Sequence, residues 1–277
     1  MKKIHNHIWI IAIIISALFM SCEKVIDLDL NSAEPRIVIE GNITSDPGPY
    51  QVSITTSGDY YTAEGIMPVS GAEVIVVDNL NHADTLSEVS DGKYLTKNLI
   101  GESDRTYSIK VVYKDKEYTG SDYLPTKVYI DSLSFEKMEF GGPGSGNKEK
   151  PRFTIYCYFT DPIETIDYYR FNVSVNDSTI SGRMNYYSLS SDQLINGKYV
   201  KYALWGVEAM TGDTISVRLD CIGYNTYEYF RTLNDALSSG GMGSTPYNPI
   251  SNLSNEALGY FGTYTADLKR IRVYESN

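Results

Sequence analysis

Short runs of β-branched residues, separated by turn residues, recur along the chain and constrain its fold more than any other feature. The first half contains RIVIEGNIT (36–44), YQVSITTS (50–57) and AEVIVVDN (72–79). Branched side chains suit a half-buried pleated surface, and short runs at regular spacing are typical of β-sandwiches. The pattern therefore predicts an all-β chain.

The strand-like runs fall into two groups that meet near Leu124 and Pro125. Residues 36–125 predict an immunoglobulin-like β-sandwich. Residues 126–277 predict a second, larger β-sandwich-like domain with one short helix. Two Gly-rich stretches in the second domain, 141–151 and 238–249, predict loops.

The expected helix begins near Asn225, which could cap it, and Glu228 follows three residues later. Apolar residues at 227, 230, 233 and 237 would share one face of this helix.

The amino terminus carries Lys2 and Lys3, then an apolar run over residues 8–19, then Ser21 and Cys22. Twelve residues as a helix span about 18 Å, which is less than a bilayer core of about 30 Å. Residues 1–21 therefore predict a cleaved signal peptide. A small residue before a cysteine resembles a bacterial lipobox, so Cys22 is the expected lipid attachment site and residues 22–35 a tether. The alternative is an ordinary signal peptide with a chance cysteine.

Two further cysteines, Cys157 and Cys221, lie in strand-like runs. An exported protein could join them in a disulfide. The alternative is a pair of buried thiols that behave as small apolar side chains. Their spacing does not decide between the two.

The ionisable residues argue against several classes of function. The formal net charge is −11, which disfavours nucleic-acid binding because such binding needs a basic surface. Of three histidines, His5 and His7 lie in the signal peptide and only His82 remains. A zinc site needs several His or Cys ligands. We therefore expect no catalytic, metal or cofactor site.

Tyrosine is abundant, at 24 of 277 residues, and several tyrosines occur in pairs. Its ring is apolar and its hydroxyl polar, which suits wet pockets and interfaces. The pairs Tyr60-Tyr61 and Tyr186-Tyr187 are the candidate ligand or partner contacts. The alternative for any single tyrosine is that it fills a strand.

The block from GAEVIVV (71–77) through DGKY (91–94) to TYSIKVVY (106–113) resembles transthyretin-like modules, also known from carboxypeptidase regulatory domains. Nearly the whole mature chain resembles the Bacteroidetes outer-membrane lipoproteins of domain-of-unknown-function family 4249. The residues that carry this resemblance are SCEKVIDLDL (21–30), RIVIEGNIT (36–44), PGPY (47–50), VSGAEVIVVD (69–78), YIDSL (129–133) and ALGYFGTY (257–264).

The resemblance implies a lipoprotein of the outer membrane, on either face, often encoded beside TonB-dependent transporters. It implies no catalytic residues. We therefore expect a non-enzymatic accessory or ligand-capturing partner of such a transporter. The alternatives are a glycan-binding surface lipoprotein and an adhesin or fimbrial-type subunit, which would assemble by strand addition.

Overall fold

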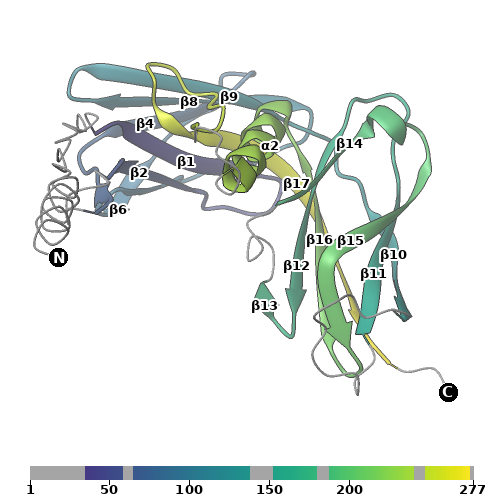
Figure 1. Cartoon of the computed structure of the whole chain (residues 1–277). Coiled ribbons are helices and arrows are strands. Elements are labelled where there is room, and N and C mark those ends of the chain that lie inside the picture. The colour runs from purple at the N-terminus through teal and green to yellow at the C-terminus, as the bar shows by residue number, and fades with distance from the viewer. Residues whose placement is uncertain (1–34, 59–64, 138–151, 180–186, 240–246, 275–277) are drawn as a thin grey trace, which may run out of the picture. The chain divides into compact units, whose positions relative to one another are not determined.

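The computed structural model describes residues 35–58, 65–137, 152–179, 187–239 and 247–274 (Figure 1). In these ranges the chain forms strands, one α-helix, α2 (Tyr224–Ser239), and one 3-10 turn, η1 (Asp192–Leu194). The predicted all-β, sandwich-like class is confirmed.

The strands form three sheets. The largest runs in the order β13 (Ser178–Thr179), β12 (Tyr168–Val175), β16 (Thr214–Ile222), β17 (Leu258–Arg272), β1 (Ile37–Thr44), β2 (Gln51–Thr56), β7 (Lys93–Leu95) and β6 (Ser87–Ser90), with β14 (Ser188–Ser191) beside β12 and β3 (Met67–Pro68) beside β2. The second has the order β5 (Ala83–Thr85), β4 (Glu73–Asp78), β8 (Arg105–Tyr113) and β9 (Lys116–Leu124). The third is β10 (Ile130–Lys137), β11 (Arg152–Thr160) and β15 (Tyr199–Met210).

The structure has two hydrophobic cores. Strands β1, β2 and β7 share the first core with β4, β8 and β9. Strands β12 and β16 share the second core with β10, β11 and β15. Alternation along the strands places apolar side chains in the cores. On β1, Ile39 and Ile43 are fully buried, while Glu40 between them is exposed.

The two predicted domains are not separate chain segments. Strand β17 pairs antiparallel with β16 over residues 264–272 and parallel with β1 over residues 258–264. One strand therefore belongs to both sandwiches, and Phe261 on it lies in the first core together with Leu253 and Ala257. Hydrophobic alternation reports which face of a strand is buried but not which strand lies beside it, so the sequence did not reveal this pairing.

Helix α2 forms where the sequence predicts it, but its cap comes from elsewhere. The helix begins at Tyr224, so Asn225 lies inside it. The backbone N–H groups of Asn225 and Thr226 donate to the Asp122 carboxylate of β9, each at 3.3 Å. A Cβ atom at Gly223 would overlap this carboxylate, so glycine is needed for the close approach.

Asp122 also binds β17. Its carboxylate accepts hydrogen bonds from the Thr226 hydroxyl at 2.5 Å, from Thr263 N at 3.2 Å and from Tyr123 N at 3.1 Å. Burial raises the pKa of Asp122 to about 6, and the hydrogen bonds from these donors offset only part of the increase. One carboxylate thus connects β9, α2 and β17.

We expect Asp122→Ala to lower the free energy of unfolding by about 2–3 kcal/mol, because it leaves buried donors at the start of α2 without an acceptor. Urea denaturation measures this loss. Thr119→Ala, on the same strand but at an exposed hydroxyl, is the matched control and should cost less than about 1 kcal/mol.

The pH dependence tests the same carboxylate. Its pKa in the folded state exceeds the unfolded value, so between about pH 4 and 6 the folded protein binds more protons. Stability from this group is present at pH 4 and is lost as the pH rises through 6. The stability difference between wild type and Asp122→Asn should therefore fall by about 2 kcal/mol from pH 4 to pH 7. A difference independent of pH would contradict this assignment.

Candidate functional site

A pocket beside α2, on the outer face of the largest sheet, is the candidate site. We call it the α2 pocket. It encloses about 320 Å³ and is lined by residues of β1, β2, β17 and α2 and by Tyr187, which precedes β14. Pockets for small ligands commonly have volumes of about 300–1,000 Å³. The α2 pocket is therefore large enough for a small ligand.

Strand alternation makes the sheet side of the pocket polar. Ile39 points into the first core, so Glu40 and Asn42 lie on the opposite face of β1 and line the pocket. Gln51 and Ser53 line it from β2 by the same alternation, and Ser53 lies opposite Glu40 in the register. These side chains supply a carboxylate, two amides and a hydroxyl.

Aromatic side chains form the helix side of the pocket. The rings of Tyr229 and Tyr260 stack with centroids 4.5 Å apart and planes 25° apart. Phe230 packs across Tyr260 at 5.1 Å and against Tyr187 at 4.7 Å. Asn234 of α2 holds Tyr187 in place, because its amide bonds both the N–H and the C=O of Tyr187 at 2.7 and 2.8 Å.

Asn42 connects the two sides. Its Nδ2 donates to the Tyr260 hydroxyl at 3.1 Å. Its Oδ1 is buried and has no hydrogen-bond partner among the described residues. A buried acceptor without a donor is uncommon and costs free energy. Asn42 therefore retains unused hydrogen-bonding capacity beside the pocket.

The charge of the pocket favours some ligands over others. Glu40 is the one ionisable carboxylate among the described lining residues, and none of these is Lys, Arg or His. Burial raises the pKa of Tyr229 to about 12, so its hydroxyl stays protonated near neutral pH. A phosphate or carboxylate ligand would have no cation to bind here.

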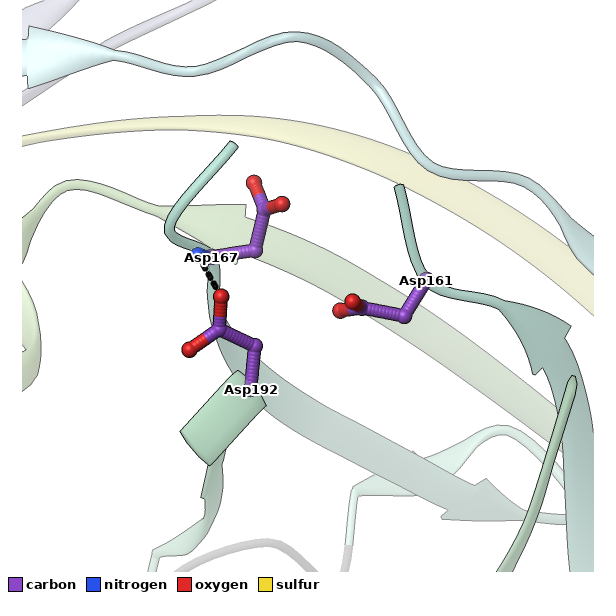
Figure 2. Close-up of side chains that lie close together, drawn as sticks. All are labelled: Asp161, Asp167 and Asp192. Atoms are coloured by element: carbon purple, nitrogen blue, oxygen red, sulfur yellow. Dashed lines mark hydrogen bonds between the residues drawn. The ribbon is translucent and has the colours of Figure 1, made fainter. Parts of the chain in front are cut away.

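Three buried aspartates, Asp161, Asp167 and Asp192, form a second cluster (Figure 2). Asp161 follows β11, Asp167 precedes β12 and Asp192 begins η1. One oxygen of each lies within 4.8 Å of the others, and Figure 2 shows the Asp161 carboxylate turned toward the other two.

Hydrogen bonds account for the positions of these carboxylates. Asp161 accepts from the Tyr169 hydroxyl at 2.5 Å and from Gly197 N at 3.0 Å. Asp192 accepts from Asp167 N at 3.0 Å, and Asp167 accepts from the Thr165 hydroxyl at 2.5 Å. Carboxylate oxygens are the ligands that Ca²⁺ and Mg²⁺ prefer. The three aspartates could therefore hold such an ion, but the hydrogen bonds explain the cluster without one.

The exposed side chain of His82 lies beside the buried carboxylate of Asp78. Its Nδ1 lies 2.9 Å from Asp78 Oδ2, and Arg105 binds the same oxygen at 2.7 Å. Burial would raise the pKa of Asp78, but the bonds from His82, Arg105 and Leu80 outweigh it and hold the pKa at about 2. Asp78 thus joins the loop after β4 to the start of β8, which is a structural role.

The sequence matches the family described as Domain of unknown function (DUF4249) over residues 23–270. The chain belongs to this family. The DUF4249 match begins directly after Cys22 and ends inside β17, so it covers both sandwiches. A search of curated proteins found no match.

Among solved structures, this DUF4249 chain is similar to a segment of two fibronectin type III domains from chicken tenascin. The identity is 15%, the match covers 68% of this chain and 90% of that chain, and the TM-score is 0.21. We draw no functional argument from this similarity.

The predicted contact tyrosines have different outcomes. Tyr187 lines the α2 pocket. Tyr60, Tyr61 and Tyr186 lie outside the described residues, as does Cys22.

Within the described ranges, no helix is both long enough and apolar enough to cross a membrane. Sequence reasoning missed the other residues of the α2 pocket, although the alternation along β1 and β2 could have indicated their outward-facing polar side chains.

Cys157 and Cys221 are free thiols buried in the second core. The structure thus corrects the possible disulfide and agrees with the alternative of two buried thiols. Cys157 lies on β11 and Cys221 on β16, in different sheets. Burial raises the pKa of each thiol to about 12, so neither forms a reactive thiolate near neutral pH.

Thiol titration tests this assignment. In Cys22→Ser protein prepared without reductant, we expect Ellman's reagent to label neither Cys157 nor Cys221 in the native state and both after unfolding in guanidinium. Cys157→Ser provides the matched control and should lose one of the two labels. Unfolded, unreduced protein without reactive thiols would show a disulfide instead.

The aspartate cluster makes a further prediction. Burial raises the pKa of Asp167, and the neighbouring charges of Asp161 and Asp192 raise it further. Asp167→Asn should stabilise the protein at pH 7, because it removes one of these like charges and keeps an acceptor for Thr165. The gain should shrink as the pH falls and vanish at about pH 3 or below, where folded and unfolded chains both bind the proton. Thermal unfolding at the two pH values measures it, and a loss of stability at pH 7 would show that the charge is needed.

Proposed function

We propose that this protein is a non-enzymatic outer-membrane lipoprotein, anchored through Cys22, that captures a ligand for a TonB-dependent transporter or assembles with one. The observation that carries the proposal is the family match, which starts at residue 23, directly after the expected lipid attachment site, and extends over both sandwiches. On this proposal, residues 22–35 tether the folded part to the membrane.

The α2 pocket supports ligand capture rather than catalysis. One wall of its cavity is polar and the other is aromatic, and this mixture is typical of a binding site. Elsewhere, the buried carboxylates are engaged in hydrogen bonds that hold segments of the fold together. Asp78 and Asp122 are examples. Such roles account for these ionisable groups without a reaction.

Two alternatives remain as proposals of lower rank. The polar and aromatic lining of the α2 pocket favours a glycan-binding surface lipoprotein. A fimbrial-type subunit needs a strand edge that accepts a strand from another subunit. In this chain the edge of β1 is already filled by β17 of the same chain, which argues against strand exchange at that edge.

Crosslinking in membranes of the native host tests the proposal. A tag after Asn277 allows recovery of the protein with its partners. We expect one TonB-dependent barrel in a near-stoichiometric amount. Recovery of the protein alone, at a crosslinking yield that captures known envelope complexes, would contradict the transporter partnership.

Cys22→Ser is the matched variant for this experiment, because it removes the lipid and leaves the folded part unchanged. We expect the variant to leave the membrane fraction and to lose most of the recovered barrel. A variant that has lost residues 1–21 and still stays in the membrane fraction would contradict anchoring through Cys22.

A further inference from the structure

We propose that the α2 pocket binds a neutral carbohydrate, through aromatic contacts from α2 and β17 and hydrogen bonds from the outward faces of β1 and β2. This inference rests on the proposed ligand-capturing function and names the chemical class of the ligand.

The aromatic wall suits the C–H faces of a sugar ring. Tyr187 and Tyr229 are half-buried, so each keeps part of its ring accessible. Packing fixes both: Tyr229 stacks on Tyr260 at 4.5 Å, and Tyr187 packs on Phe230 at 4.7 Å. Aromatic side chains held in this way present a large apolar area that loses little conformational entropy when a ligand binds.

The polar wall suits hydroxyl groups. A sugar hydroxyl both donates and accepts, and so do the amides of Asn42 and Gln51 and the hydroxyl of Ser53. Glu40 adds a charged acceptor, which makes stronger hydrogen bonds than a neutral one. These four side chains come from two adjacent strands, so they present their polar atoms side by side along one wall of the pocket.

The charge of the described lining disfavours the other common polar ligands. An anionic sugar or phosphate would meet Glu40 and no cation among the described lining residues. A cationic ligand would have Glu40 alone as its counter-charge, and three neutral polar side chains would then have no specific role. A neutral polyhydroxylated ligand uses both walls.

An array of neutral hexose and pentose oligosaccharides tests the proposal. The probe protein is the full-length chain, purified in an amine-oxide detergent because this detergent has no sugar headgroup. Isothermal titration then measures affinity for the strongest binder, and tetralysine serves as the cationic comparison. We expect a neutral oligosaccharide to bind with a dissociation constant in the millimolar range or below.

Two variants and two matched controls locate the site. Tyr229→Leu and Gln51→Ala should each weaken binding by roughly tenfold, as expected for the loss of one aromatic contact or one hydrogen bond. Tyr224→Leu changes an exposed tyrosine on the same helix, and Thr55→Ala changes the same face of β2 beyond the pocket, so neither should alter affinity. Circular dichroism checks that each variant folds, and Gln51 is exposed, so its variant should fold even if Tyr229→Leu does not.

Several outcomes would overturn the inference: no binding on the array, preferential binding of tetralysine, or sugar binding that Gln51→Ala leaves unchanged. These outcomes are independent of the proposed transporter partnership. A protein that recovers a barrel by crosslinking but binds no neutral sugar would overturn the ligand class alone, and sugar binding without a barrel would overturn the partnership alone.

Discussion

The carboxylate of Asp122 is the interaction on which the arrangement of this protein depends. It lies on β9 of the first sandwich and accepts hydrogen bonds from the start of α2 and from β17. A helix that begins in a protein interior needs acceptors for its first N–H groups. Here the acceptor comes from a strand that lies about a hundred residues earlier in the chain. The start of α2 is thereby fixed on the first sandwich, and the face of the helix that lines the pocket is fixed with it.

Strand β17 extends this connection through the backbone. Its hydrogen bonds to β16 and to β1 belong to one continuous sheet, so β17 is a strand of both sandwiches and joins them directly. Around α2, the outer face of this sheet carries polar and charged side chains. Arg170 and Asp220 form a buried ion pair there at 2.9 Å, and the Arg170 guanidinium packs over the ring of Phe230 at 4.7 Å. Phe230 is held between this ion pair and the aromatic wall of the pocket.

This organisation explains why the candidate site lies at the edge of α2. The two cores consist of apolar residues packed between sheets. The polar faces of β1 and β2 become a pocket only where the helix covers one side of them. Loops commonly carry binding residues on a rigid β-scaffold. In this chain the described part of the site is instead built on strands and a helix.

The sequence by itself determined the all-β class and the position of the helix, because these follow from local periodicity and turn residues. It also singled out Tyr187, which lines the α2 pocket and whose role as a contact stays a prediction. The tertiary structure decided the rest. Glu40 and Tyr260 lie in opposite halves of the chain and become neighbours only through the parallel pairing of β1 with β17. The cap of α2 is likewise supplied by Asp122 rather than by the local Asn225. Long-range pairing depends on which surfaces remain unpaired after each segment has folded, and no local pattern records that.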